Sequence, residues 1–362
     1  MFARITGIGA YIPERRVSNV ELEKIIPTSD AWIQENIGVV TRSVIAPGET
    51  IADMGRHAAR EALTKSDRSD IGLVICATNS PDTLYPATAC RIAHELGLGF
   101  VPAFDLQAGC TGFLYALAQA KPFVETAGKS ALVIGSDALS TGFCWGGDPS
   151  ARTRGVAAAH EVHPSGGPSA RTRGVAAAHE VHPSGDRNAV LFGDGAGAVV
   201  LSPSEEPGIL AIEIGAEYSD GITLKTPYDS ALSSPLHYLA GESERRPGDW
   251  YTKMNGRAIM KLSLTHVPKA MDTVIERAGL NKKDVSVFLP HQTNKHVIRK
   301  LAEHIGFPTE KIPDVLSQYG SLSTAVIPVS MHMVQSRMKD GDNILITAYG
   351  AGFTYGAAIM RL

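Results

Sequence analysis

An alternation of short apolar runs with helix-like segments is the feature that most constrains the fold. In the first half of the chain, apolar runs that end in turn residues predict buried strands at 70–77, 101–106 and 131–135. Helical periodicity precedes or separates these runs, at 50–62 and 87–96. Strands that alternate with helices in this way form a parallel sheet covered by helices, so we expect an α/β fold.

The last third of the chain repeats this pattern, with a long helix predicted at 255–278, a strand at 285–289 and further helices and strands after it. A repeated α/β pattern predicts two related lobes with a site between them. We place the division after residue 201, which gives an N-terminal lobe of residues 1–201 and a C-terminal lobe of residues 202–362.

A tandem repeat interrupts the N-terminal lobe. Two copies of the 18-residue sequence PSARTRGVAAAHEVHPSG, separated by one glycine, span residues 149–185. Two copies are too few to build a solenoid, which needs about three units to bury a core. The repeat is also poor in large apolar residues, so it has little to bury. We therefore expect a surface insertion at 149–186.

Composition excludes several classes of protein. The 362 residues are 44% hydrophobic and 20% charged with a net charge of −3, which is typical of a globular protein and gives no basic excess for nucleic acid. No apolar run is long enough to span a membrane, and the chain begins without a signal pattern. The four cysteines form no CxxC pair, which argues against disulfides and a zinc site. We expect a cytoplasmic protein without a metal or another bound cofactor.

Cys110 is the candidate nucleophile. It follows the apolar run 101–106 across the small residues Ala108 and Gly109, where a helix is predicted to begin. Free backbone N–H groups and the helix dipole favour a thiolate at such a position. The alternative is a small buried cysteine with a packing role only. Pro122 is expected to end or kink the helix that follows Cys110.

Two further segments could complete a catalytic site. His291 follows the predicted strand at 285–289, at the carboxyl end where α/β folds place their chemistry. The run 350–352, Gly-Ala-Gly, could aim backbone N–H groups at an oxyanion. A thiolate, an imidazole and an amide-lined hole are the parts needed for acyl transfer through a thioester. The glycine-rich run at 192–198 is followed by another apolar run rather than a helix, so we expect it to allow close backbone packing rather than to bind a dinucleotide.

Several motifs of the chain resemble those of the β-ketoacyl-ACP synthase III family, which has the thiolase fold. They are TSDAWI at 28–33, GCTGF at 109–113, FGDGAGA at 192–198, PHQTN at 290–294 and YGAGFTYG at 349–356. The resemblance implies two related βαβαβ lobes in a five-layered α-β-α-β-α arrangement. It also implies a homodimeric enzyme of fatty acid or polyketide biosynthesis, whose substrates are acyl-CoA and a malonyl thioester carried by an acyl carrier protein.

The resemblance assigns the catalytic roles residue by residue. Cys110 would accept the acyl group, and His291 would polarise the malonyl thioester during decarboxylative Claisen condensation. The oxyanion hole would use the N–H groups of Cys110 and Ala351. The family has a catalytic asparagine where this chain has Ser321, whose hydroxyl is a shorter, single donor. This change leaves two alternatives open: an acyltransferase that acts on an alcohol or amine without decarboxylation, and a non-catalytic partner subunit.

The resemblance also assigns substrate contacts. Trp32 and Arg187 match the pair that holds the CoA adenine by stacking and cation–π contact. Asn294 matches an asparagine that contacts CoA. Tyr85 matches an aromatic residue that reaches across the dimer and closes the acyl pocket of the partner.

Overall fold

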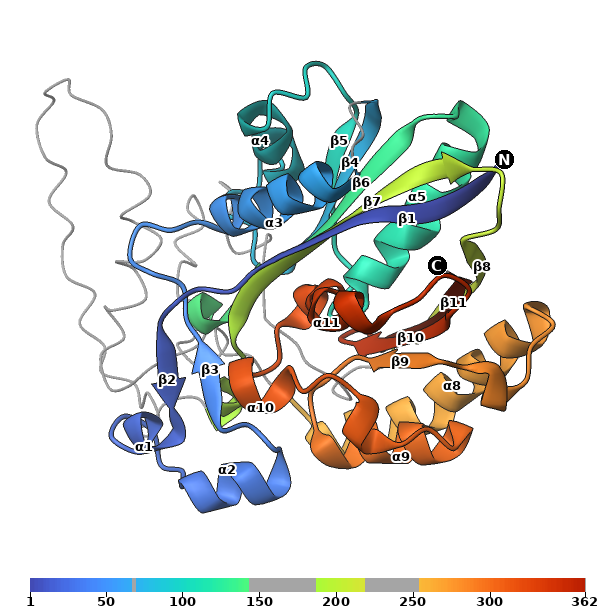
Figure 1. The fold of residues 1–362 in the computed structure, drawn as a ribbon. Coiled ribbons are helices and arrows are strands. Elements are labelled where there is room, and N and C mark those ends of the chain that lie inside the picture. Colours follow the sequence, from blue (N-terminus) through green and yellow to red (C-terminus); the bar gives the residue numbers. More distant parts are fainter. Residues whose placement is uncertain (67–69, 143–186, 219–253, 362) are drawn as a thin grey trace, which may run out of the picture.

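The structure is a computed structural model that describes residues 1–66, 70–142, 187–218 and 254–361 (Figure 1). The predicted insertion at 149–186 lies outside the described residues. Two sheets form the framework. The first has the strand order β1 (Phe2–Tyr11), β7 (Asp194–Ser204), β6 (Ser130–Ala138), β4 (Ile71–Ala77) and β5 (Ala103–Leu106). The second has the order β8 (Ile209–Ala216), β11 (Thr354–Arg361), β10 (Asn343–Gly350) and β9 (Val287–Pro290).

Both sheets are mixed rather than purely parallel. Strand β4 pairs in parallel with β5 and β6, and β10 pairs in parallel with β9. The strands β1, β7, β8 and β11 make antiparallel pairs. A two-stranded ribbon of β2 (Arg16–Ser18) and β3 (Thr41–Ser43) stands apart from both sheets. The predicted parallel pairing therefore holds for the strands that carry the crossover helices, and the antiparallel strands complete each sheet.

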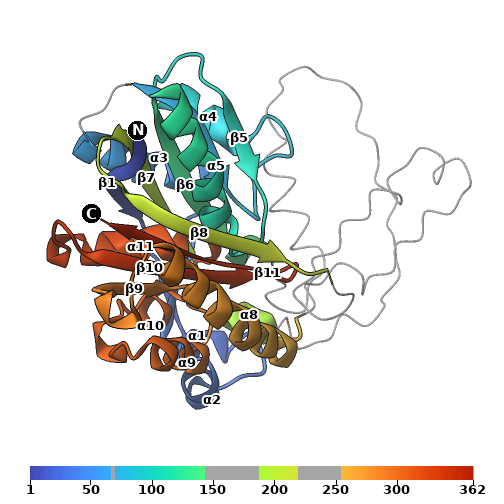
Figure 2. The ribbon, with the colours of Figure 1, turned by 90° about the vertical axis from the view of Figure 1, so that its right-hand side faces the viewer.

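Helices cover both sheets and also fill the space between them (Figures 1 and 2). On the outer face of the first sheet lie α3 (Ile51–Ser66) and α4 (Thr88–Glu95). Between the sheets lie α5 (Gly112–Ala127) and α11 (Val326–Val334), whose apolar side chains share one core with strands of both sheets. The outer face of the second sheet carries α8 (Gly256–Arg277) and α9 (Lys295–Ile305). This confirms the five-layered α-β-α-β-α arrangement. The division into lobes at residue 201 remains a prediction.

Short sequence signals fix where several helices begin. Ser18 caps α1 (Asn19–Leu22) and forms a capping box with Glu21. Ser29 caps α2 (Asp30–Asn36) through a bond from the N–H of Trp32, and Asn255 caps α8. The described residues contain no helix that is both long enough and apolar enough to cross a membrane.

The apolar run at 101–106 is an edge strand, so its predicted burial is wrong. Among the described strands β5 pairs only with β4, and Phe104 is 41% exposed. The neighbouring Asp105 points instead to α4, where its carboxylate accepts hydrogen bonds from the N–H groups of Thr88 and Ala89 at 2.7 and 2.8 Å. Val101, Ala103 and Leu106 are partly buried against the core, whereas Phe104 faces the surface.

Two local predictions about other elements are also wrong. Of the two expected effects of Pro122, an end of the helix is wrong: α5 continues to Ala127, and the buried Val124 beyond the proline packs into the core between the sheets. The apolar residues before the glycine-rich run, which resemble a strand in sequence, are not a strand, because η2 (Arg187–Val190) is a 3-10 helix. The glycines of the following strand do allow close packing as predicted, since a Cβ on Gly197 would lie 2.7 Å from Pro328 of α11.

Candidate active site

Cys110 lies where the sequence predicted it, between β5 and α5, two residues before the helix begins. It is buried, and the hydroxyl of Ser323 donates a hydrogen bond to its sulfur at 3.5 Å. Burial raises the pKa of the Cys110 thiol to about 11. Desolvation therefore opposes the thiolate that we expect at this position in the free enzyme. The thiol is protonated at neutral pH.

The glycine-rich run 350–352 packs directly against the backbone around Cys110. A Cβ on Gly109 would lie 2.8 Å from the nitrogen and 2.9 Å from the oxygen of Ala351, and one on Gly350 would lie 2.5 Å from the nitrogen of Cys110. The hydroxyl of Thr354 lies 3.0 Å from the carbonyl oxygens of both Ala108 and Ala351, so it joins the two segments. The peptide nitrogens of Cys110 and Ala351 are thereby brought to neighbouring positions.

His291 follows β9 and is completely buried. Its backbone N–H donates to the oxygen of Thr347 in β10 at 2.7 Å, and its ring meets the ring of Tyr349 edge-on with centroids 5.2 Å apart. Neither ring nitrogen has a hydrogen-bond partner among the described residues. Burial lowers the pKa of His291 to about 3, so the imidazole is neutral and offers one donor and one acceptor.

Ser321 is held by the backbone of the 192–198 motif. Its backbone N–H donates to the carbonyl oxygen of Leu191 at 2.9 Å, and its backbone carbonyl oxygen accepts from the N–H of Gly193 at 3.1 Å. The hydroxyl is buried and, like the ring nitrogens of His291, has no hydrogen-bond partner within the described ranges. Buried polar groups are rarely left without partners, so these two side chains are candidates for substrate contact.

The residues predicted to contact CoA lie on α2, α9 and η2, which are linked by hydrogen bonds. Trp32 on α2 is 51% exposed. Asn294 caps α9: its oxygen accepts from the N–H of His296 at 2.9 Å, and its amide donates to the oxygen of Asn36 at 2.8 Å. The start of α9 is thus fixed to the end of α2. Arg187 begins η2, and its side chain is not described.

Sequence reasoning missed Arg42, a completely buried arginine in β3. Its guanidinium donates to Asn19 at 2.6 Å and to the oxygen of Val190 in η2 at 3.1 Å. Asn19 in turn donates to Asp30, the first residue of α2, at 2.8 Å. The two elements predicted to hold the CoA adenine are therefore joined through one guanidinium. No signal in the sequence distinguished this arginine from one on the surface.

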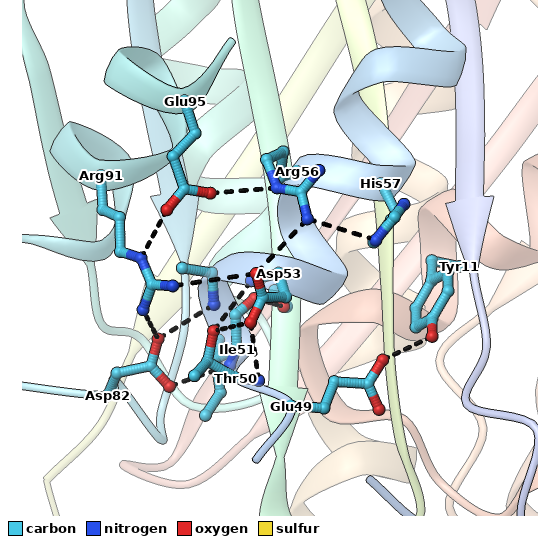
Figure 3. A network of polar contacts seen from close by, with 12 residues as sticks. Tyr11, Glu49, Thr50, Ile51, Asp53, Arg56, His57, Asp82, Arg91 and Glu95 are labelled. Carbon is cyan, nitrogen blue, oxygen red and sulfur yellow. Dashed lines mark hydrogen bonds and ion pairs between the residues drawn. The ribbon is translucent and has the colours of Figure 1, made fainter. Parts of the chain in front are cut away.

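Tyr85 lies on a loop whose base is fixed and whose tip is exposed. The carboxylate of Asp82 accepts from the N–H groups of Ile51 and Ala52 at 2.9 and 3.0 Å, which caps α3. Arg91 of α4 lies 3.7 Å from the same carboxylate, within the polar network drawn in Figure 3. Tyr85 itself is 85% exposed, so the loop presents it to solvent.

No group of three or more His, Cys, Asp and Glu side chains that could hold a metal ion occurs within 1–66, 70–142, 187–218 and 254–361. The described part of the site consists of one thiol, one imidazole, hydroxyls and backbone amides. Such groups are suited to transfer of an acyl group through a thioester.

Two family models match the chain. The model described as "3-Oxoacyl-[acyl-carrier-protein (ACP)] synthase III" matches residues 104–159 and 174–218, and the model of the same description for the C terminal matches residues 275–362. The unmatched residues 160–173 fall inside the tandem repeat. The proposed extent of the insertion, 149–186, stays a prediction.

Relatives and solved structures agree with these matches. The chain is 34% identical to the β-ketoacyl-[acyl-carrier-protein] synthase III of Thioalkalivibrio sulfidiphilus, over 99% of each chain, and 35% identical to that of Alkalilimnicola ehrlichii, again over 99% of each. The crystal structure of 3-oxoacyl-[acyl-carrier-protein] synthase III from Aquifex aeolicus superposes with a TM-score of 0.79 at 33% identity, covering 99% of this chain and all of the other. The priming β-ketosynthase of the R1128 polyketide pathway gives a TM-score of 0.79 at 29% identity, over 100% of this chain and 96% of the other. The chain therefore belongs to the β-ketoacyl-[acyl-carrier-protein] synthase III family, acyl-transferring condensing enzymes of the thiolase fold.

Proposed function

We propose that this enzyme takes an acyl group from acyl-CoA onto Cys110 and condenses it with a malonyl thioester, releasing CO₂ and a β-ketoacyl product. One observation carries the proposal: the backbone of the 350–352 run packs against Cys110, so two peptide nitrogens lie beside the sulfur-bearing residue. Family membership supports the same reaction type.

In the acylation step, the sulfur of Cys110 attacks the thioester carbonyl of acyl-CoA. The N–H groups of Cys110 and Ala351 stabilise the oxyanion, as such donors do in acyl transfer. The carbon–sulfur bond to CoA then breaks, and the proton of the Cys110 thiol ends on the departing CoA sulfur. Because the pKa of Cys110 is raised by burial, this proton is lost only as the substrate reacts.

In the condensation step, His291 and Ser321 donate hydrogen bonds to the thioester oxygen of the malonyl group. The bond to the carboxylate breaks, CO₂ leaves, and the electron pair forms an enolate. Its carbon attacks the acyl carbonyl, and Cys110 leaves as a thiolate that regains a proton. Both donors are buried without partners among the described residues, which supports their contact with substrate.

The alternative function is acyl transfer to an alcohol or amine without decarboxylation. The short hydroxyl of Ser321 favours it, and a neutral imidazole at His291 could accept the proton of an acceptor hydroxyl. Intact-mass measurement after incubation with a panel of acyl-CoAs, followed by malonyl thioesters, tests both functions and the proposal of a non-catalytic subunit.

Each outcome of that measurement is distinct. The proposed function requires one acyl mass on the wild type, none on Cys110→Ala, and CO₂ release with a β-ketoacyl product on addition of a malonyl thioester. Acylation without CO₂ release, discharged by an alcohol or amine, would replace it with the alternative. A wild type that gains no acyl mass would favour the third alternative, a non-catalytic partner subunit.

For substrate delivery, we propose that Trp32 and Arg187 hold the CoA adenine. The side-chain amide of Asn294 donates one of its two hydrogens to Asn36, and we propose that the other contacts CoA. An acyl carrier protein delivers the malonyl group at the same entrance, where α9 presents Lys295 and Arg299. The double charge reversal Lys295→Glu and Arg299→Glu should raise the KM for carrier-bound malonate and leave that for malonyl-CoA nearly unchanged. Equal KM changes for both substrates would contradict this docking site.

We further propose that the enzyme is a homodimer formed along β5, with Tyr85 closing the acyl pocket of the partner. Within the part of the chain that the structure describes, β5 has one neighbouring strand, and exposed apolar side chains lie on it or precede it in the sequence, namely Leu84, Tyr85, Phe100 and Phe104. An apolar edge strand left open is an aggregation hazard, so a second copy is its natural cover. Sedimentation equilibrium should give twice the chain mass for the wild type and a shift toward the monomer for Phe104→Glu. A monomeric wild type would rule the dimer out.

We also propose that the enzyme acts in the cytoplasm and needs no metal or other bound cofactor, since thioesters supply the acyl groups and the site chemistry uses a thiol, an imidazole and amides. Extensive dialysis against EDTA should leave its activity unchanged.

A further inference from the structure

A polar network beneath Cys110 has no part in the reaction described above. Its first member is Ser323, whose buried hydroxyl donates to the sulfur of Cys110 at 3.5 Å. The oxygen of the same hydroxyl accepts a hydrogen bond from the side-chain amide of Asn79 at 3.1 Å. Because Asn79 supplies a donor, the single hydrogen of Ser323 is directed toward the sulfur.

The backbone of Ser323 is held in an unfavourable conformation. Its φ is +52°, and no other non-glycine residue in the described part of the chain has a positive φ. Such a conformation costs free energy and persists only where the surroundings impose it. Here the next residue, Thr324, imposes it: the Thr324 hydroxyl lies 2.8 Å from Asp137 and 3.0 Å from the oxygen of Ala77.

Asp137, at the end of β6, is the centre of this network. Its carboxylate is completely buried and accepts bonds from the side chain of Asn79 at 3.2 Å and from the backbone of Asn79 at 2.6 Å. Further donors to the same carboxylate are the hydroxyls of Thr78, Ser80 and Thr324 and the N–H of Thr324. One carboxylate thus fixes both Asn79 and the segment that carries Ser323.

We propose that Ser323 is a further catalytic residue, whose hydroxyl stabilises the thiolate of Cys110 as it attacks the acyl thioester and again as it leaves after condensation, and that Asn79 and Asp137 position it. This inference rests on the proposed role of Cys110 as the nucleophile. Hydrogen bonds to a charged group are stronger than those to a neutral one, so the bond favours the thiolate over the thiol.

The charges around the sulfur agree with a stabilising role for Ser323 and a positioning role for Asp137. The hydrogen bond from Ser323 lowers the pKa of Cys110, whereas burial and the negative charge of Asp137 raise it. Asp137 therefore opposes the thiolate electrostatically, and its contribution to catalysis is geometric. The other titratable groups of this region are Tyr349, on whose pKa the charge of Cys110 acts, and the neutral His291. The first turn of α5 carries no acidic residue.

Ser323→Gly gives a sharp test. Glycine accepts a φ of +52° without strain, which offsets the lost hydrogen bond from Asn79, so the variant should melt close to the temperature of the wild type while lacking the hydroxyl. The rate of Cys110 alkylation by iodoacetamide, followed by peptide mass mapping from pH 6 to 10, should fall about tenfold or more at each pH. Acylation by acyl-CoA should fall by a similar factor.

Two further variants separate this role from a structural one. Ser323→Ala keeps the Cβ and should lose the same factor in alkylation rate, and Asn79→Ala should lose part of it. Ser330→Ala is the matched control, because Ser330 is a buried serine of α11 whose hydroxyl has no partner among the described residues. It should alkylate at Cys110 like the wild type.

The inference and the proposed function can fail separately. If the wild type forms no acyl-enzyme at Cys110, the proposed function is wrong. If Cys110 is acylated but Ser323→Gly and Ser323→Ala alkylate within twofold of the wild type, Ser323 has no catalytic role and the inference is overturned.

Discussion

Replacing Gly109 by alanine should push the 350–352 run away from Cys110. Gly109 has a φ of +58°, and a Cβ there would lie 2.8 and 2.9 Å from the nitrogen and oxygen of Ala351. Both contacts are to backbone atoms, which cannot move aside as a flexible side chain can, so the 350–352 run must shift. The left-handed backbone costs alanine about 1 kcal/mol, and the overlap adds about 1–3 kcal/mol.

The larger effect should be on chemistry. A shift of Ala351 withdraws one of the two proposed oxyanion donors, and loss of one such donor lowers the rate about 100-fold to 1,000-fold. Single-turnover acylation, quenched at intervals and followed by intact mass, should show this loss in Gly109→Ala. A control with the same backbone cost is Gly279→Ala after α8, where φ is +67° and a Cβ would meet nothing within 4 Å.

The control should lose about 1 kcal/mol of stability, a melting shift of roughly 2 °C, and acylate like the wild type. Both variants bear the cost of alanine at a positive φ. The difference between them therefore measures the contact between Gly109 and the 350–352 run alone. If Gly109→Ala acylates within about fivefold of the wild type and melts like the control, then the packing of the 350–352 run on Cys110 does not create the oxyanion hole.

Other predictions concern single steps. If the enzyme decarboxylates, Ser321→Asn should speed CO₂ release from labelled malonyl thioester without altering acylation of Cys110, and an unchanged rate in both Ser321→Asn and Ser321→Ala would show that this position is unimportant. Trp32→Ala should raise the KM for acyl-CoA and leave kcat nearly unchanged, because it removes uniform binding; a collapsed kcat at constant KM would contradict the adenine contact. Deleting residues 149–186 should preserve a cooperative circular-dichroism melt and acylation, and loss of the melt would count against an insertion. Alkylation of Cys110 should rise about tenfold per pH unit from pH 6 to 10, since its pKa is about 11 and that of His291 about 3; an inflection near pH 6.5 would indicate that the imidazole titrates there.

The layers of the fold could be predicted because period and capping are local properties of the sequence. The helix predicted at 255–278 begins at its cap Asn255, and this cap, like the capping box at Ser18, depends on residues within one turn. The exposure of β5 could not be predicted in this way. An apolar run looks the same whether a core or a second chain covers it, and the strand order is needed to see that β5 has one neighbour among the described strands. Arg42 was missed for a similar reason, since its acceptors at Asn19 and Val190 lie far apart in the sequence.

In the site, too, the features with local causes could be predicted from the sequence, and those set by distant residues could not. The place of Cys110 at the start of α5 is a local property, and the sequence predicted it. Its charge state is not local, because the desolvation that raises its pKa depends on burial by distant elements that only the folded chain assembles around it. The hydroxyl of Ser323 opposes this desolvation. Ser323 is separated from Cys110 by 213 positions and held in place by Asn79 and Asp137 from two other strand ends. The helix start that places the proposed nucleophile is therefore local, whereas the donor that would stabilise its thiolate depends on contacts that only the folded chain makes.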